Sequence, residues 1–303
     1  MFLIDTDPGL DDAHAIAMAA HRIPADELVI TTSFGNVDLE TTTENARWLL
    51  GTMSPDAPIY RGCAGPLLGA REAATHIHGE DGLGGCPRDG GPLSPVSEGH
   101  AAVKIVEFAR EFGSDLTIVA LGPLTNLAVA RQLEPDLDSM VGRVVVMGGS
   151  PAGFGNASVN AEFNFFADPA AAEIVLGAFS NLSLITWDVC LQNRFSESEM
   201  RDFWRGDSAT SAQLRLIMEH RLRTDSDYAA SVDYGRADPL AMAVALDPDC
   251  VTRAETHPIT VGYDNGVAHG ASIVDWADTL TSRRSITLPL EFDRPALLDL
   301  MTV

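Results

Sequence analysis

Four aspartates stand within the first twelve residues of the chain: Asp5, Asp7, Asp11 and Asp12. The apolar residues 2–4 precede them, Pro8-Gly9 separates the two pairs, and an Ala-rich segment with helical periodicity follows. This order predicts a strand, a turn and a helix. In an extended strand Asp5 and Asp7 point to the same face, and the turn brings Asp11 and Asp12 back towards it. We therefore expect four carboxylates to converge at the carboxyl end of a strand, where open α/β sheets bind ligands.

The repulsion among these carboxylates requires an opposing charge. A single Asp at a helix start is usually a cap, but four acids in eight residues cannot all cap one helix. A helix N-terminus offsets negative charge by only about 0.3–1 kcal/mol at exposed sites. A bound cation is the simpler solution, and oxygen ligands without thiolate or imidazole favour Ca²⁺ or Mg²⁺. The loop spacing and the missing central Gly exclude an EF-hand.

The composition of the whole chain limits its partners and its location. Acids outnumber bases 43 to 20 in 303 residues, a net charge of −23 that argues against nucleic acid or an anionic membrane as partner. No apolar run approaches the ~20 residues of a membrane helix, and a strand at the start leaves no room for a signal peptide. We expect a cytoplasmic protein with reduced cysteines, because the four Cys are widely spaced.

The elements that position the acids alternate between strands and helices. Helices are expected at 10–21, 39–50, 100–111, opening at 122–126, at 169–176, 197–203 and 211–223, from 238, and at 294–301. Strands are expected at 2–4, 28–33, 59–60, 116–121, 144–147 and 182–187, with antiparallel strands near 259–263, 272–274 and 286–290. Alternation predicts an α/β fold with a mostly parallel, open central sheet flanked by helices, Rossmann-like, and a small antiparallel edge. No Pro, Ser and Gly-rich stretch divides the chain, so we expect a single domain spanning 1–303.

Further polar residues follow the ends of the predicted strands. Asn36 comes just after the strand at 28–33, where it either lines the site or only shapes the turn. Residues 155–168 combine amides, a carboxylate and aromatic rings after another strand, as in a polyol pocket with an apolar wall. The Gly- and Pro-rich segment 61–99 is long for a compact domain and contains His76 and His78. It is either a lid over the site or a simple surface loop.

Taken in order, these segments resemble the nucleoside hydrolases of the inosine-uridine preferring type, which cleave the N-glycosidic bond of ribonucleosides. The resemblance covers nearly the whole chain. The motifs that carry it are Asp5-Thr6-Asp7-Pro8-Gly9-Leu10-Asp11-Asp12, Phe34-Gly35-Asn36, His78-Gly79 with Gly82-Leu83-Gly84, Gly122-Pro123-Leu124-Thr125-Asn126, Met147-Gly148-Gly149, Ala161-Glu162-Phe163-Asn164 and Asp238.

The resemblance implies a cofactor, a base and a substrate site. Its Ca²⁺ ligands would be the carboxylates of Asp7, Asp12 and Asp238 and the backbone oxygen of Leu121. Asp7 would also take the proton of the metal-bound water that attacks the anomeric carbon. The sugar would be bound by Asp11, Asn36, Asn156, Glu162 and Asn164, with Phe163 lining the pocket. Family members are commonly oligomers, so a homodimer or homotetramer is implied.

One position departs from the family pattern. Several members carry a His before the last metal Asp, as proton donor to the departing base, whereas this chain has Ala237. The candidate substitutes are His78, His220, Asp227, Tyr228 and Trp187. Of these, His78, Trp187 and Tyr228 are included among the expected substrate-binding residues, and Trp187 would act by stacking on the base. The base preference therefore stays open.

The acidic cluster has a chemical rationale that does not depend on the family. Glycosidic bond cleavage generates an oxocarbenium-like sugar, and carboxylates stabilise its positive charge. The same carboxylates would repel phosphorylated substrates, which favours nucleosides over nucleotides. The alternative function is a non-catalytic Ca²⁺-dependent nucleoside or ribose binder, suggested by Ala237 alone. A third reading, a haloacid dehalogenase-type phosphatase, would start from Asp5-Thr6-Asp7, but Gly9 departs from its motif.

Overall fold

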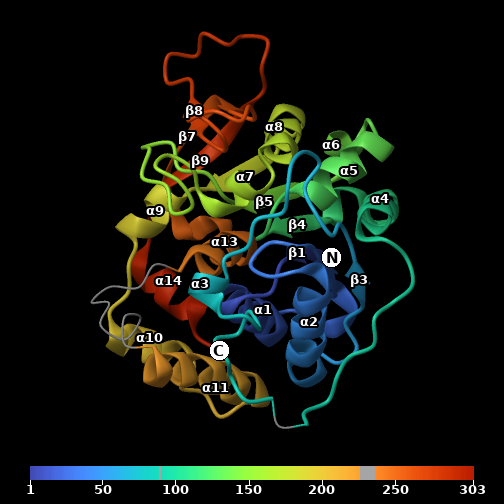
Figure 1. The fold of residues 1–303 in the computed structure, drawn as a ribbon, viewed down its shortest axis with the longest axis vertical. Coiled ribbons are helices and arrows are strands. Elements are labelled where there is room, and N and C mark those ends of the chain that lie inside the picture. The colour runs from blue at the N-terminus through green and yellow to red at the C-terminus, as the bar shows by residue number, and fades with distance from the viewer. Residues whose placement is uncertain (89, 226–235) are drawn as a thin grey trace.

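The computed structural model describes residues 1–88, 90–225 and 236–303 (Figure 1). Its centre is a nine-stranded sheet in the order β3-β2-β1-β4-β5-β6-β9-β7-β8. The strands are β1 (Phe2–Thr6), β2 (Leu28–Thr32), β3 (Ile59–Arg61), β4 (Thr117–Ala120), β5 (Arg143–Met147), β6 (Leu182–Ile185), β7 (Val251–Val261), β8 (Ser272–Val274) and β9 (Ser285–Phe292). All neighbours from β3 to β6 pair in parallel. Because β7 pairs antiparallel with both β8 and β9, the predicted mixed α/β sheet is confirmed.

Helices cover both faces of this sheet (Figure 1). They are α1 (Leu10–Arg22), α2 (Leu39–Met53), α3 (Thr75–His78), α4 (Ala101–Phe112), α5 (Thr125–Leu133), α6 (Leu137–Met140), α7 (Phe163–Ala167), α8 (Pro169–Ala178), α9 (Trp187–Gln192), α10 (Glu197–Phe203), α11 (Ala209–Thr224), α13 (Ala237–Leu246) and α14 (Arg294–Met301). Short 3₁₀ turns lie at 25–27, 113–115 and 248–250. Helices α1, α2, α11, α13 and α14 pack on one face, and α4, α5 and α8 on the other.

The parallel strands read as continuous apolar runs because both of their faces are buried. In β1, Ile4 belongs to the core under α1 and α13, whereas its neighbour Leu3 belongs to the core under α4 and α5. Every residue of β2 is buried. The sheet is thus a rigid platform, and its loops at the carboxyl ends of the strands are free to carry the site.

Several segments differ from the sequence prediction, which did not include α6 or α7. The strand predicted at 182–187 ends at Ile185, because Thr186 caps α9 and Trp187 begins that helix. Strand β7 begins at Val251, well before residue 259, because its first half pairs with β9. The predicted loop 61–99 contains the short helix α3. For β6 and β7 a helix cap or a distant partner strand, which local periodicity does not report, sets the boundary.

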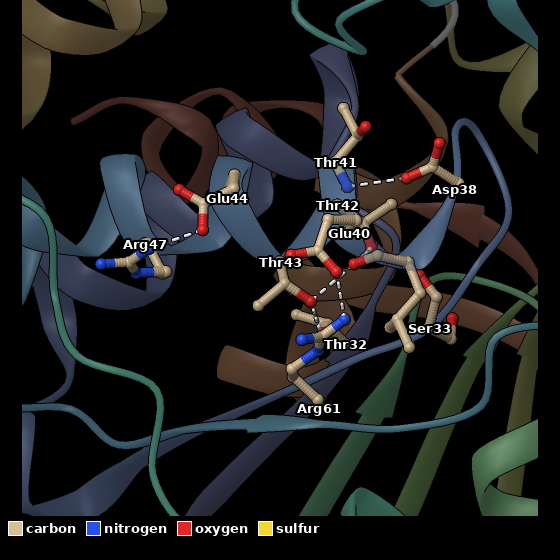
Figure 2. A network of polar contacts seen from close by, with 11 residues as sticks. Thr32, Ser33, Asp38, Glu40, Thr41, Thr42, Thr43, Glu44, Arg47 and Arg61 are labelled. Carbon is tan, nitrogen blue, oxygen red and sulfur yellow. Dashed lines mark hydrogen bonds and ion pairs between the residues drawn. The ribbon is translucent and has the colours of Figure 1, made fainter.

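A polar network fixes the segment between β2 and α2 (Figure 2). Asp38 caps α2 by accepting from the backbone N–H of Thr41 at 2.9 Å. The Thr43 hydroxyl lies 2.9 Å from that of Thr32, which joins the helix to the strand. Arg61 of β3 forms an ion pair with Glu40 at 2.5 Å. These contacts hold the connection 33–38 and therefore the position of its polar residues.

Among helices of the described residues, none combines the length and apolarity that a membrane span requires. The four cysteines carry free thiols. The cytoplasmic location and the homo-oligomer remain predictions from the sequence.

Candidate active site

A cavity of about 420 Å³ opens at the carboxyl ends of the central strands. Predicted site residues that line it are Asp11, Asn36, His78, Leu121, Asn156, Glu162, Phe163, Asn164, Trp187 and Asp238. Asp7 and Asp12 are fully buried and do not line it. His220 also lies outside its lining, and Tyr228 and Asp227 fall outside the described residues. The structure thus gathers residues from many separate loops around one cavity.

Three carboxylates form a tight cluster at this cavity. One oxygen each from Asp11, Asp12 and Asp238 lies within 4.8 Å of the others. Burial, and then the charges of its acidic neighbours, raise the pKa of Asp238 well above its usual range. Asp11, which the resemblance assigned to the sugar, therefore joins two of the expected metal ligands. These acids come from α1 and from the start of α13, two helices that pack together.

The carboxylate of Asp7 lies beside this cluster and not within it. Its Oδ2 accepts from the backbone N–H of Asn36 at 2.7 Å. Burial first, and then the charge of Asp12, raise the pKa of Asp7 well above its usual range. Asp7 is therefore a buried carboxyl group that readily holds a proton when no cation is near.

Asp12 is oriented by three donors. Its Oδ1 accepts from the Thr6 hydroxyl at 2.5 Å. Its Oδ2 accepts from Gly9 N at 2.9 Å and from Asn36 Nδ2 at 3.0 Å. A side chain at position 9 would not fit, because a Cβ there would lie 2.4 Å from His78 Nδ1. The Pro8-Gly9 turn therefore allows the strand end, Asn36 and the loop His to meet.

The expectation that Asp5 joins this group is wrong. Its Oδ1 accepts from Thr31 Oγ1 at 2.6 Å and from Asn126 Nδ2 at 2.8 Å. Burial raises the pKa of Asp5 to about 6, although these hydrogen bonds oppose the rise. Asp5 links β1 to β2 and to α5, so its side chain fixes the carboxyl end of these strands and does not face the cavity. Asn126, in the Gly-Pro-Leu-Thr-Asn motif, has the same structural role.

The wall after β5 presents the groups suited to hydroxyl recognition. Glu162 caps α7, accepting from Asn164 N at 2.8 Å and from Gly149 N at 2.9 Å. Burial raises the pKa of Glu162 to about 7. Asn164 Nδ2 donates to Leu121 O at 2.6 Å, and Asn156 Oδ1 accepts from Phe163 N at 2.8 Å. Since one amide atom of each Asn is engaged by the backbone, these side chains have defined orientations.

The segment before and within α3 forms another part of the wall. His78 Nδ1 accepts from Leu10 N at 3.0 Å, so the neutral ring carries its proton on Nε2. Burial lowers the pKa of His78, which favours that neutral form. Glu72, His76 and Ile77 also line the cavity, and sequence reasoning did not assign them to it. They come from a segment without periodicity, and no local signal marks them.

Beyond α3, the lining includes Met147, Phe166, Arg236 and Ala237, which were not predicted as substrate contacts. Arg236 Nε donates to the sulfur of Met200 at 3.0 Å, so part of its guanidinium points into the apolar core. Ala237 contributes only a methyl group to the cavity. The position at which this chain differs from the family pattern, Ala237 in place of His, therefore lines the cavity.

The fold and the site define an α/β enzyme with an acidic, partly apolar cavity at the carboxyl edge of its sheet. The family model described as "Inosine-uridine preferring nucleoside hydrolase" matches residues 2–299. The chain belongs to this family, and it is an N-glycosidase.

Individual relatives agree with this assignment. The inosine-uridine preferring nucleoside hydrolase of Leishmania major is 32% identical over 300 residues, covering 96% of this chain and 93% of that protein. Uridine nucleosidase 1 of Arabidopsis thaliana is 32% identical over 273 residues, covering 86% of this chain and 80% of that protein. Among solved structures, a plant nucleoside hydrolase superposes with a TM-score of 0.87 at 29% identity, covering 99% of this chain and 97% of that chain. An inosine-guanosine nucleoside hydrolase superposes with a TM-score of 0.86 at 28% identity, covering 99% and 96%.

Proposed function

We propose that this enzyme hydrolyses the N-glycosidic bond of ribonucleosides to ribose and free base in a Ca²⁺-dependent reaction. The observation that carries the proposal is the cluster of Asp11, Asp12 and Asp238, with oxygens within 4.8 Å of one another, at the edge of a 420 Å³ cavity. The same cavity holds amide and carboxyl groups that match sugar hydroxyls. A cavity of this size accommodates a nucleoside.

The donor set fits a hard divalent cation. All the clustered side chains offer oxygen, and Asp12 and Asp238 are buried, where uncompensated charges are costly. Asp11, Asp12 and Asp238 would hold Ca²⁺, with Asp7 and the backbone oxygen of Leu121 as further ligands. When bound, the ion supplies positive charge that acidifies a water molecule and holds sugar hydroxyls. Its charge would also offset the burial and the acidic neighbours that raise the pKa of Asp238.

The chain's own residues would divide the work of hydrolysis. Asp7 would accept the proton of the attacking water, since Asn36 N holds one of its oxygens and its charged form is restored near a cation. Glu162, Asn156 and Asn164 would bind hydroxyls and orient the ribose. As the glycosidic bond lengthens, the nearby carboxylates would stabilise the developing oxocarbenium charge.

The departing base must be stabilised without an imidazole at position 237. His78 can donate an Nε2–H hydrogen bond to the departing base from the α3 side of the cavity, because its Nδ1 is engaged by Leu10 N. Trp187 lines the same cavity and would stack on a base. We propose that these two side chains replace the missing His.

The experiment that tests the function compares two buried acids, Asp7 and Asp5. Wild-type protein is assayed for ribose release from purine and pyrimidine nucleosides, with Ca²⁺ and with chelator. Asp7→Asn should lower kcat by about 10²–10⁴-fold while nucleoside binding survives, because a positioned proton acceptor is lost. Asp5→Asn, at a carboxylate bonded to Thr31 and Asn126, should lower the melting temperature and leave most of kcat.

Two outcomes would contradict the proposal. Binding of nucleosides without ribose release by the wild-type protein would favour the alternative of a non-catalytic Ca²⁺-dependent nucleoside or ribose binder. Equal loss of binding and rate in Asp7→Asn would mark Asp7 as a metal ligand without a role as base.

A further inference from the structure

Residues 262–271 connect β7 to β8 and pack against the part of the active-site wall that includes α7. About a hundred residues of sequence separate this connection from α7. Ala271 forms an antiparallel bridge with Ala161. Ser272 Oγ accepts from Ser150 N at 2.8 Å. Gly270 has φ +74°, and a Cβ there would lie 2.7 Å from the Cα of Phe166, so only glycine allows this approach. The antiparallel end of the sheet is therefore built onto the loop that carries the site.

His269 makes the most specific contact of this connection. Its Nδ1 lies 2.9 Å from the backbone oxygen of Asp264, and its Nε2 lies 3.2 Å from the backbone oxygen of Phe166. The ring also packs edge-on against the Phe166 ring, with centroids 5.0 Å apart and an interplanar angle of 81°. Carbonyl oxygens only accept, so a ring N–H of His269 can donate to the backbone oxygen of Asp264 or of Phe166.

Phe166 is part of the cavity wall. It lies on α7 after the hydroxyl-recognising residues, and its N–H donates to Glu162 O at 2.8 Å. A displacement of Phe166 would therefore change the apolar wall of the cavity and the position of Glu162, which caps α7. His269 itself does not line the cavity, so any effect on substrate passes through Phe166.

We propose that His269 is a positioning residue for nucleoside binding, which clamps Phe166 and the end of α7 against the substrate from the β7–β8 connection. This inference rests on the proposed function, since it takes the cavity to be the nucleoside site. The acidic cluster lies on α1 and α13, and Asp7 directly follows β1, whereas the hydrogen bonds and ring contact of His269 go to Asp264 and Phe166. The clamp therefore supports substrate binding in the ground state and the transition state alike.

The test removes the ring nitrogens of His269 and keeps an aromatic ring at that position. His269→Phe retains a planar ring beside Phe166 but cannot donate to either carbonyl oxygen, and His269→Gln retains an amide donor. His257 offers a matched control, because its ring nitrogens also face two oxygens, Asp278 Oδ1 at 3.0 Å and Glu255 Oε2 at 3.4 Å. Its ring packs edge-on against Trp276 with centroids 5.0 Å apart, and it does not line the cavity.

We expect His269→Phe to raise KM for a nucleoside such as inosine by about tenfold, with kcat changed by less than about threefold. His269→Gln should recover at least half of that loss on a logarithmic scale, and His257→Phe should leave KM unchanged. Hydrogen exchange of residues 161–167 should be faster in His269→Phe than in His257→Phe. The exchange measurement needs no turnover, so it tests the clamp even if ribose release is absent.

The outcomes separate the clamp from the function on which it rests. An active wild-type enzyme with unchanged KM and unchanged exchange in His269→Phe would overturn the clamp alone. A wild-type protein without ribose release would overturn the proposed function, and faster exchange at 161–167 would then still support the contact. Equal KM increases in His269→Phe and His257→Phe would show a general loss of structure and would also overturn the clamp.

Discussion

Replacement of Asp238 by Asn should change the stability of this enzyme in opposite directions with and without Ca²⁺. Asp238 is buried, and one of its oxygens lies within 4.8 Å of oxygens of Asp11 and Asp12. Without a cation, the substitution removes a repelling charge and keeps the shape of the side chain. With Ca²⁺, it removes a charged ligand. The folded protein should therefore gain stability in chelator and lose it in Ca²⁺.

The size of the effect follows from the spacing of the charges. At an effective dielectric constant of about 20, two unit charges 4.8 Å apart repel by about 3.5 kcal/mol, so two neighbours give about 7 kcal/mol. An acid with an ordinary pKa of 3.8 can escape this cost at pH 7 by binding a proton, which takes about 4 kcal/mol. Asp11 is partly exposed, and solvent screens its charge. We expect Asp238→Asn to gain about 1–4 kcal/mol in chelator.

The assay is thermal unfolding of wild type and Asp238→Asn, each in excess chelator and in Ca²⁺. A gain of about 1–4 kcal/mol corresponds to about 2–6 °C for a protein of 303 residues. Ca²⁺ at a thousandfold excess over its Kd should stabilise the wild type by about 4 kcal/mol, and the variant by much less. The control is Asp168→Asn, since Asp168 is a buried acid outside the cluster that accepts from Thr125 Oγ1 at 2.6 Å.

The control should lose stability equally in chelator and in Ca²⁺, because its carboxylate caps α8 and supports no ion. The reasoning about the cluster is refuted if Asp238→Asn melts below the wild type in chelator while calorimetry shows an unchanged Ca²⁺ affinity. A variant that is more stable in chelator but still binds Ca²⁺ normally would confirm the repulsion and reject Asp238 as a ligand.

Two further predictions concern the leaving group and pH. Ala237→His should raise kcat on inosine or uridine and leave nitrophenyl riboside turnover unchanged, since only the natural bases need a proton; no gain would show that another residue already supplies it. In chelator, the wild-type melting temperature should fall as pH rises from about 4 to 7. Burial raises the pKa values of Asp7, Asp12 and Asp238 above 3.8, so the folded state keeps protons that the unfolded state releases. Ca²⁺ should flatten this fall, and an upward trend in chelator would contradict it.

The order of strands and helices was encoded locally. Apolar runs such as 28–33 and 144–147 are short and β-branched, and the helices between them have a 3.6-residue period, so burial could be read from the sequence. The predicted helix at 294–301 has the observed bounds. Acids at two helix starts likewise marked Asp12 and Asp238, because a strand end and a helix start fix where such side chains point.

The membership of the acidic cluster depended on tertiary structure. By strand alternation Asp5 and Asp7 are equivalent, yet Asn126, 121 residues away, bonds to Asp5 and removes it from the site. Asp11 takes part because α1 packs against α13, which brings it to Asp238. Local patterns state which groups are polar and buried, but the partner of each is chosen by packing between elements far apart in sequence.

In the rest of the cavity wall, too, long-range packing decides which residues meet. Glu72 and His76 come from a segment without periodicity, and they reach the cavity only because α3 docks beside α1 through His78 and Leu10. His269 gave no signal in the sequence, since a His in a turn is ordinary. Its contact with Phe166 exists because β7 and β8 extend the sheet past β9 and fold their connection onto α7. The sequence determined the sheet, its helices and the acids at their junctions, whereas long-range packing decided which side chains meet around the substrate.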